Sequence, residues 1–547
     1  MNGSEIRIKP VYLALVILGA AVYLSGLFTD VFIDAGKYAA VSRGIADSGD
    51  LVHVKIMSEP YLQKPPFLFW LAALSIKIFG ISNFAFKFPT FLFSMLGFYS
   101  TYRLGKLLYG QSTGIVAAVM LAFSQAMFLY NNDTHTDTVL TSCIIFSIWQ
   151  LYEYYRFKRI GNYFLSFLSA GCAMITKGPV GVIIPLVAFG GHILLIKDYR
   201  SLFSWKWIPG IVIIFGVTYP VLNGLYDQFG MGGMKFFFWT NNMGRITGDY
   251  AGDSTDYSFY IHTFSYIFLP WSLISFFSFY MEALSLYRAG FRLTGMKEFI
   301  CWSGILFFLI IFSIAKMKSP HYMLPVIPLI SILTAKWIVR IAEENNYLKK
   351  GNVIIILQNI IGGILIFLTA FILFVSFPGS GLPVTIAFLL LVIFFVYISF
   401  IYRKNRYEKI LLSSLTAIAI LNLIFNTVLL PGLNRYHAAA RASELFNELS
   451  PDEAVLHNFG YDGFEMGFYA KNQGKVLHKP DLGKLARLGD TWIFTTEGGL
   501  DIIRKMDIRY EVIAEFPYIK LSNINFNMLL PDSREKEAQA TFLIILK

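Results

Sequence analysis

Residues 11–28 read VYLALVILGAAVYLSGLF, a run of 18 residues without a charged side chain. Such a run is long enough to cross a hydrocarbon core of about 30 Å. Further apolar runs of this kind recur along the chain as far as Pro431. The first run lacks a small-x-small cleavage site and leads straight into a polar segment, so we interpret it as a retained membrane anchor and not as a signal peptide.

The composition indicates a membrane protein. Of the 547 residues, 56% are hydrophobic and only 15% are charged, against about 25% charged in a typical soluble domain. The net charge of +11 does not indicate a nucleic-acid partner, because the basic residues stand in short clusters between apolar runs, as membrane orientation requires. Cys143, Cys172 and Cys301 fall inside apolar runs, so we predict small core residues and neither disulfides nor a metal site.

The apolar runs predict an all-α polytopic bundle with about thirteen spans of ~20 residues each. We place the spans at 10–28, 84–105, 112–130, 138–156, 161–176, 178–196, 207–226, 257–282, 298–316, 320–340, 352–376, 384–402 and 409–430. Segment 65–80, PPFLFWLAALSIKIFG, is the ambiguous one. Cytoplasmic connections, which are every second one along the chain, are expected to be rich in Lys and Arg. Basic groups such as Arg103/Lys106 and Lys197/Arg200/Lys206 all fall on that side only if segment 65–80 does not cross the membrane. We therefore predict an interfacial or re-entrant helix there.

The chain divides into two predicted domains. Residues 1–432 form the transmembrane domain, in which outer loop 29–83 carries juxtamembrane helices and a second outer loop covers 227–256. Residues 433–547 alternate strand-like runs (AVLHNF, TWIFTT, TFLIILK) with turn residues and contain one helical stretch, HAAARASELFNEL, which predicts a small α/β domain. An odd number of spans puts the amino terminus in the cytoplasm and this domain on the opposite side.

The predicted outer connections hold a particular set of polar residues. Asp34 and Lys37 lie three apart, so on a helix starting near Ile33 they share one face. Lys64 stands just before two prolines, whose fixed φ angles hold it near the membrane surface. Asp137 begins a span, where the helix dipole favours a carboxylate. Further polar side chains on this side are Tyr61, Gln63, Lys177, Arg245, Lys318, His321 and Tyr322.

Each of these residues also has a simpler interpretation. The two aspartates are suited to be helix caps, and Lys64 and Lys177 to be snorkelling interfacial lysines. His321 has no second histidine or carboxylate at metal-ligand spacing in the sequence, which favours a hydrogen-bonded interfacial histidine. All of these residues are predicted on the same side of the membrane, which favours a functional interpretation. Placing polar groups near the membrane costs free energy, so such groups usually have a function.

Two carboxylates and several cations suit a reaction with an anionic leaving group and a neutral hydroxyl nucleophile. The cations stabilise a departing phosphate, and a carboxylate takes the proton from the hydroxyl. A lipid-phosphate donor explains why these groups stand at the bilayer edge. A membrane transporter of a lipid-linked or small solute is the more distant alternative, since it would place polar groups at the midplane and often repeats its fold internally. We find no internal repeat.

In these residues the chain resembles class C membrane glycosyltransferases, which include protein O-mannosyltransferases and the aminoarabinose transferase of lipid A. The resemblance is carried, in order, by DAGKYAAVSRGIADSGDLV, YLQKPPFLFWLAAL, THTDTVL, ITKGPVG and KSPHYMLPVIP. The segment YDGFEMGFYAKNQGKVL is similar to the start of the soluble domain of many bacterial members.

The resemblance implies an undecaprenyl (polyprenyl) phosphate sugar donor and an inverting single displacement with an aspartate base. It implies a periplasmic acceptor such as lipid A, with a protein hydroxyl or an envelope glycan as alternatives. The location implied is the bacterial inner membrane, with the carboxyl-terminal domain in the periplasm and membrane lipid as a further partner. No cofactor follows from it, and a divalent metal is left open.

The resemblance also assigns roles to individual residues. It places Asp34 and Asp137 at the catalytic aspartates and Lys37, Lys64, Arg245 and Tyr322 at donor-phosphate positions. From their place in the outer connections, we add Tyr61, Gln63, Lys177, Lys318 and His321 as candidate residues that line the site. Lys37 stands where aminoarabinose transferases have arginine. Two family acids are replaced here by Ala35 and Gln63. These losses weaken the prediction of an amino-sugar donor or a metal.

Overall fold

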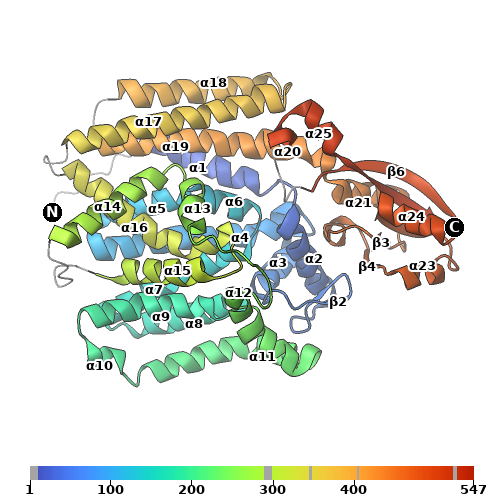
Figure 1. Cartoon of the computed structure of the whole chain (residues 1–547), viewed down its shortest axis with the longest axis horizontal. Coiled ribbons are helices and arrows are strands. Elements are labelled where there is room, and N and C mark those ends of the chain that lie inside the picture. The colour runs from blue at the N-terminus through green and yellow to red at the C-terminus, as the bar shows by residue number, and fades with distance from the viewer. Residues whose placement is uncertain (1–9, 289–297, 344–347, 403–405, 521–525) are drawn as a thin grey trace. The chain divides into compact units, whose positions relative to one another are not determined.

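The computed structural model describes residues 10–288, 298–343, 348–402, 406–520 and 526–547 (Figure 1). The chain forms two compact units. The helical unit comprises Met1–Gly26, Thr90–Thr369 and Gly381–Leu423, and the mixed unit comprises Leu27–Pro89, Ala370–Ser380 and Ile424–Lys547. The domain boundary predicted at residue 432 stays a prediction.

The helical unit is built from apolar helices joined by short connections. They are α1 (Pro10–Gly26), most of α4 (Asn83–Tyr109), α5 (Gln111–Ala122), α6 (Gln125–Asn132), α7 (Thr136–Phe157), α8 (Ile160–Lys177), α9 (Val180–Leu195), α10 (Tyr199–Leu202), α11 (Trp207–Lys235), α12 (Met243–Thr247), α13 (Phe259–Ile267), α14 (Ser272–Arg288), α15 (Ile300–Ile314), the 3₁₀ segment η3 (Pro320–Val326), α16 (Ile327–Glu343), α17 (Leu348–Phe371), α18 (Leu382–Val396) and α19 (Arg406–Ile424).

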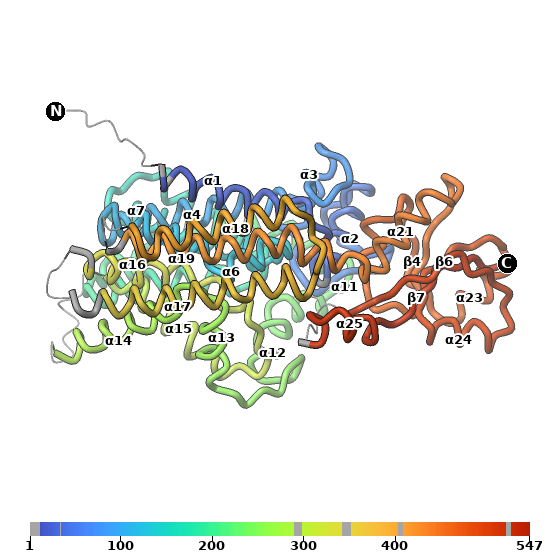
Figure 2. The backbone as a smooth tube through the Cα atoms, turned by 90° about the horizontal axis from the view of Figure 1, so that it is seen from above, coloured from blue at the N-terminus to red at the C-terminus, as the bar shows by residue number. Residues whose placement is uncertain are grey.

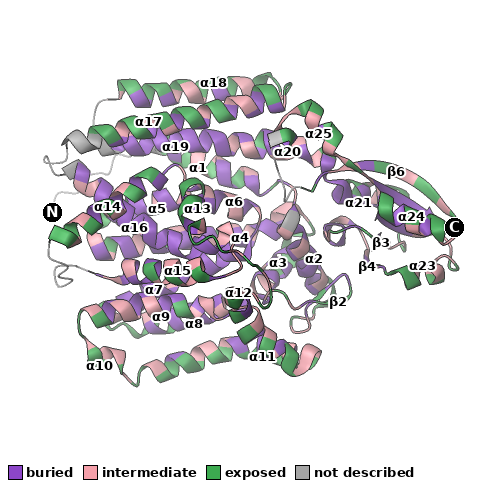
Figure 3. Ribbon diagram, viewed as in Figure 1, coloured by how far each residue is buried: buried purple, intermediate pink, exposed green. Residues whose placement is uncertain are grey.

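Burial separates the centre of the helical unit from its rim. In the segment Pro320–Ile341, 89% of the apolar window is buried, whereas only 22% is buried in Leu382–Ile401. Figure 3 shows the contrast between α16 and the outward faces of α18. Phe367 on α17 and Ile393 on α18 are exposed although both side chains are large and apolar. A surface of this kind is stable against lipid chains, not against water.

Close helix packing depends on small residues. A Cβ atom at Gly362 of α17 would lie 2.7 Å from the Phe395 ring of α18 and 3.4 Å from Ala417 of α19, so only glycine permits this approach. The three helices run side by side in Figure 2. Cys143 and Cys301 are buried and Cys172 is half-buried, and all three are free, as the sequence predicted.

The predicted number of spans is not confirmed. Within the described ranges, five helices are long and apolar enough to cross a membrane, or six if α5 and α6 count as one span bent by 48°. Several predicted spans are interrupted: 112–130 is divided between α5 and α6, and 257–282 between α13 and α14. The local signals for these breaks are short: Ser124, which caps α6, and Pro270, which stands between α13 and α14. Segment 65–80 forms the 13-residue α3 (Phe67–Phe79), too short to span.

The mixed unit combines the first outer loop with the carboxyl-terminal region. Its elements are α2 (Ile33–Ser48), β1 (Lys55–Ile56), β2 (Glu59–Pro60), α3, the start of α4, the π-helical segments η5 (Ile372–Ser376) and η7 (Phe425–Leu429), α20 (Leu430–Leu433), η8 (Asn434–Tyr436), α21 (Ala438–Leu449), β3 (Leu456–Phe459), α22 (Met466–Tyr469), β4 (Gln473–Val476), α23 (Lys479–Leu485), β5 (Thr491–Thr496), α24 (Glu497–Lys505), β6 (Tyr510–Tyr518), η10 (Phe526–Leu529), α25 (Pro531–Glu537) and β7 (Gln539–Leu546).

A five-stranded sheet of order β4-β3-β5-β7-β6 forms the carboxyl-terminal part of this unit. β3 pairs in parallel with β4 and β5, and β7 pairs antiparallel with β5 and β6. Ile493 of β5 packs in one core with Leu482 of α23 and Leu500 of α24. The neighbouring Trp492 points the other way and meets Phe446 of α21, as the two-residue period of a strand requires. The predicted small α/β domain is confirmed at this level.

Arg43 of α2 ties the outer loop to the carboxyl-terminal segment within the mixed unit. Its guanidinium is 4% exposed. Nη1 donates to the Phe468 carbonyl at 2.8 Å and to the Ala470 carbonyl, and Nη2 donates to the Lys471 carbonyl at 2.6 Å. A planar group with five N–H donors suits this arrangement, and a lysine ammonium does not reproduce it.

Replacing Arg43 by methionine should therefore lower the free energy of unfolding of the purified protein by about 2–4 kcal/mol, because three buried carbonyls lose charged donors. Chemical denaturation followed by tryptophan fluorescence measures the change. The matched control is Arg441→Met, at an exposed position of α21. Equal stabilities of the two variants would show that the Arg43 contacts contribute nothing.

Candidate active site

The helical unit brings Asp137 and Lys177 together where α7 begins and α8 ends. The Lys177 ammonium lies 2.5 and 2.6 Å from the two carboxylate oxygens of Asp137. The Asp137 side chain is 1% exposed and that of Lys177 13%. The two helices are consecutive and antiparallel, so the first turn of one meets the last turn of the other. Each charge also stands at the helix end whose dipole favours it.

His135 and His321 complete the surroundings of this ion pair. His135 caps α7, and its Nδ1 lies 2.8 Å from Asp137 Oδ2. The His321 ring, from η3, is 4.3 Å from the His135 ring between centroids. Its Nδ1 shares a hydrogen bond of 2.8 Å with the Ser319 hydroxyl. Both oxygens of Asp137 are thus engaged by neighbouring groups.

Tyr322 links this cluster to Arg245. The Lys177 ammonium lies 4.5 Å from the centroid of the Tyr322 ring. Arg245 Nη1 donates to the Tyr322 hydroxyl at 2.5 Å, and its Nε donates to Asn241 Oδ1 at 2.8 Å. Two cations, two imidazoles and a phenol are therefore concentrated around one carboxylate. Lys318 is directed differently: its ammonium donates to the Ala315 carbonyl at 2.5 Å and lies 5.9 Å from the Tyr257 ring.

His321 is hydrogen-bonded, as the sequence analysis favoured, but in space it also has two neighbours that could bind a metal. Ligand atoms of His135, Asp137 and His321 all lie within 4.8 Å of one another, although sequence spacing separates His321 from the other two. Three protein ligands are the number that a catalytic zinc site uses. The Lys177 ammonium, however, already binds both Asp137 oxygens, and it would repel a dication at the same place. In this arrangement the cluster fits a salt bridge and not a metal.

In the mixed unit, α2 presents Asp34 and Lys37 on one face, as predicted. The helix begins at Ile33, and the Lys37 ammonium lies 3.9 Å from Asp34 Oδ1. The Asp34 side chain is 43% exposed, so unlike Asp137 it is open to a ligand. The two residues line a cavity of about 170 Å³. The other side of this cavity comes from His437, Tyr461, Asp462, Phe464, Glu465 and Lys520.

Tyr61, Gln63 and Lys64 follow the β1–β2 hairpin and precede α3. Tyr61 is buried and its ring packs edge-on against Phe69 of α3, at 5.8 Å between centroids. Gln63 is exposed and Lys64 half-buried. Lys64 does not line the Asp34 cavity. Because these residues and Asp34 belong to one unit while Asp137 and Arg245 belong to the other, the predicted meeting of the two groups stays a prediction.

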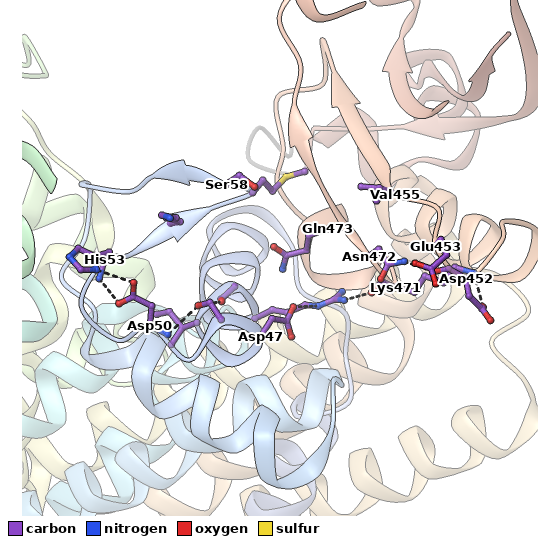
Figure 4. Close-up of a pocket in the computed structure, with 16 residues that line it drawn as sticks. Asp47, Asp50, His53, Ser58, Asp452, Glu453, Val455, Lys471, Asn472 and Gln473 are labelled. Atoms are coloured by element: carbon purple, nitrogen blue, oxygen red, sulfur yellow. Dashed lines mark hydrogen bonds and ion pairs between the residues drawn. The ribbon is translucent and has the colours of Figure 1, made fainter. Parts of the chain in front are cut away.

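A larger cavity of about 650 Å³ lies in the mixed unit at the other end of α2 (Figure 4). Its walls carry Asp47, Asp50 and His53 on one side and Lys471 and Gln473 on the other. His53 donates its backbone N–H to Asp50 at 2.9 Å, which holds the pKa of that carboxyl below its usual value. None of the sequence-predicted residues lines this cavity.

Sequence reasoning missed His135, His437 and Glu465. His135 stood in the quoted THTDTVL segment, and its distance of two residues from Asp137 was the available signal. Glu465 stood in YDGFEMGFYAK, a segment noted only for its resemblance. Nothing in the local sequence shows that His437 and Glu465 line a cavity with Asp34 of α2, because both residues lie more than 400 positions after Asp34.

Comparison with known proteins defines the class. The model of the family described as dolichyl-phosphate-mannose-protein mannosyltransferase matches residues 63–223. An uncharacterized protein of Aquifex aeolicus is 26% identical over 93% of this chain and 94% of its own length. The undecaprenyl phosphate-alpha-4-amino-4-deoxy-L-arabinose arabinosyl transferase of Edwardsiella ictaluri is 26% identical over 60% of this chain. That match spans 59% of the transferase, less than two thirds of its length.

The fold agrees with these relatives. The crystal structure of ArnT from Cupriavidus metallidurans bound to undecaprenyl phosphate has a TM-score of 0.77 and covers 97% of both chains, at 16% sequence identity. The chain therefore has the fold of a multi-pass membrane glycosyltransferase, and it is similar in sequence to enzymes of the protein mannosyltransferase and arabinosyl transferase type. The transporter alternative is thereby set aside.

Proposed function

We propose that the chain transfers a sugar from a polyprenyl-phosphate donor to a hydroxyl group of an acceptor in the periplasm. The observation that carries the proposal is the cluster of Lys177, Arg245, His321 and Tyr322 at the helix ends of the apolar unit. Groups that bind an anion are costly near membrane depth unless they have a ligand there. A lipid phosphate supplies that anion at the bilayer edge.

The displacement that we propose forms one bond and breaks one. The acceptor oxygen attacks the anomeric carbon of the sugar while the bond from that carbon to the phosphate oxygen breaks. The electron pair leaves with the phosphate, whose growing negative charge Arg245 and Tyr322 stabilise. The acceptor proton passes to Asp34, whose exposed carboxylate is placed to act as the base. Attack from the side opposite the phosphate inverts the anomeric centre.

The two aspartates divide the work in this proposal. Both oxygens of Asp137 are held by Lys177 and His135, and the side chain is buried, so it is poorly placed to accept a proton. We therefore assign Asp137 to positioning Lys177 beside Tyr322. Lys37 and Lys64 are assigned to the donor phosphate or its sugar on the strength of the resemblance. The acceptor that we favour is lipid A, with a protein hydroxyl or an envelope glycan as the alternatives.

Reconstitution in liposomes tests the proposal. Purified protein is supplied with undecaprenyl-phosphate sugars, both an amino pentose and a neutral hexose, together with lipid A, a serine- and threonine-containing peptide or an envelope glycan. Mass spectrometry detects the glycosylated acceptor and the released undecaprenyl phosphate in equal amounts. The proposal fails if donor crosses the bilayer intact, or if no combination yields undecaprenyl phosphate above the protein-free control.

Removing the Arg245 guanidinium should weaken donor binding. Arg245→Ala is expected to raise the donor KM about 10- to 100-fold, since a charged hydrogen bond to phosphate contributes roughly 1.5–3 kcal/mol. Steady-state kinetics at saturating acceptor measure the effect. Arg504→Ala is the control, because Arg504 is exposed and pairs with Glu497 and Asp501. A donor KM that is unchanged in Arg245→Ala would remove this residue from the phosphate site.

A further inference from the structure

Glu465 lies directly against α2 at Gly36, two residues after the predicted base Asp34. A Cβ atom built on Gly36 would be 2.4 Å from Cγ of Glu465, 3.0 Å from its Cδ and 3.2 Å from its Oε1. Only a glycine at position 36 leaves room for this carboxyl group. Glu465 and Asp34 both line the 170 Å³ cavity described above, one from the carboxyl-terminal segment and one from α2.

The Glu465 carboxyl group is buried and held in place by its own segment. It is 7% exposed, and the Tyr461 hydroxyl donates to Oε2 at 3.4 Å. Burial raises the pKa of Glu465 above its usual value, although His437 and the backbone N–H groups of Glu465 and Phe464 favour the ionised form. A carboxyl group of this kind can both donate and accept hydrogen bonds to a neutral polar ligand.

His437 is a second buried polar group in the same cavity. It is 5% exposed, and neither ring nitrogen has a hydrogen-bond partner among the described residues. Oδ2 of Asp30 lies 3.8 Å from Nδ1, an ion-pair distance when the ring is protonated. Buried polar atoms are nearly always satisfied in folded proteins, so an unsatisfied imidazole that lines a cavity points to a ligand.

Two of the charged pairs in the cavity wall are closed by ion pairs, whereas Glu465 interacts with the Tyr461 hydroxyl and with His437. Lys37 pairs with Asp34 at 3.9 Å, and Lys520 pairs with Asp462 at 2.9 Å. Tyr461 and Tyr518 add hydroxyl groups to the wall. The cavity is small, about 170 Å³, and most of its lining side chains are charged or carry hydroxyl groups. This polar lining suits a single sugar ring better than a lipid chain.

We infer that Glu465 is a specificity-determining residue that binds a polar ring substituent of the transferred sugar in the cavity beside Asp34. This inference rests on the proposed function. It also explains the two acids missing from the outer loop: Ala35 and Gln63 replace them there, and Glu465 brings a carboxyl group to α2 from the carboxyl-terminal segment. His437 then supplies a second polar contact to the same ring.

The test uses the full-length enzyme and a set of undecaprenyl-phosphate sugar donors, each lacking one hydroxyl or amino group of the ring. Wild-type enzyme should lose at least tenfold in kcat/KM with one member of the set, because a site built to hydrogen-bond a substituent rejects the analogue that lacks it. Glu465→Ala should turn over the complete donor about 10- to 100-fold less efficiently. It should also discriminate against that analogue by less than threefold.

Gly36→Ala provides an independent variant that leaves the carboxyl group in the protein but displaces it. Alanine normally stabilises a helix relative to glycine by about 1 kcal/mol, so a loss of activity here does not come from α2 itself. The matched control is Gly44→Ala on the same helix, where the nearest atom to a new Cβ is 3.7 Å away. We expect Gly36→Ala to lose discrimination as Glu465→Ala does, and Gly44→Ala to keep it.

The outcomes separate this inference from the proposed function. Transfer by the wild-type enzyme reports on the function, whereas the ratio of kcat/KM values between donors reports on Glu465. If Glu465→Ala slows all donors equally, or if Glu465→Ala and Gly36→Ala keep the wild-type ratio, the residue does not contact the sugar. Glu465→Gln covers the case in which the alanine variant does not fold, since glutamine keeps the shape and should still lower the ratio.

Discussion

Replacing Asp34 by asparagine should lower kcat for sugar transfer by about 10²- to 10⁴-fold, the range that a general base contributes. Asparagine has the shape of aspartate but accepts no proton at neutral pH. The Asp34 side chain is 43% exposed and its ion pair with Lys37 is 3.9 Å long, so asparagine at this position should leave the folded protein intact. Donor binding, measured by the quenching of tryptophan fluorescence, should change by less than threefold.

The control for this variant is Asp47→Asn. Asp47 stands on the same helix, pairs with Arg43 at 3.4 Å and lines the larger cavity, not the cavity beside Asp34. Its kcat should stay within twofold of wild type. Normal turnover by Asp34→Asn would remove Asp34 as the base, and a parallel loss in both variants would indicate damage to α2 instead of lost chemistry.

The second large effect concerns stability. Asp137→Ala or Lys177→Met alone should lower the free energy of unfolding by about 3–5 kcal/mol, since each leaves an uncompensated charge in a buried site. The double variant should recover much of this loss, because neither charge remains. A double-mutant cycle with chemical denaturation measures the coupling between the two residues. The exposed pair Lys547 and Asp490, at 3.1 Å, is the control, and its removal should change stability by less than about 1 kcal/mol.

The same cycle separates positioning from catalysis. If Asp137 only positions Lys177, conservative Asp137→Asn should weaken stability and donor binding while kcat at saturating donor falls less than in Asp34→Asn. A stable Asp137→Asn protein with intact donor binding and no turnover would reverse the assignment and make Asp137 the base. Stability and kcat must therefore be measured on the same preparations.

The local sequence pattern was enough to predict elements whose structure depends on a single segment of the chain. The spacing of Asp34 and Lys37 predicted a shared helix face, and α2 starts at Ile33 as expected. The strand-like run TWIFTT coincides with β5, and HAAARASELFNEL contains α21. These elements follow from hydrophobic periodicity, which neighbouring residues carry by themselves.

Local pattern failed where polar or short segments form elements. β4 reads QGKV and β6 reads YEVIAEFPY, and neither shows a clear apolar alternation. Each is fixed by its partner strands β3 and β7. The break between α5 and α6 was also missed, because its local signal is only Ser124, which caps α6, inside a long hydrophobic run.

The sequence by itself determined that the chain is an apolar helical membrane protein with a small mixed domain. It also identified the polar residues whose place near the membrane indicates a function, namely Asp34, Lys37, Asp137, Lys177, Arg245 and Tyr322. Only the tertiary structure decided which of them touch. Asp137 meets Lys177 across 40 positions, and Gly36 meets Glu465 across more than 400. Hydrophobic periodicity reports which face of an element is buried, but the partner of that face is chosen by packing between distant segments, which no local pattern records.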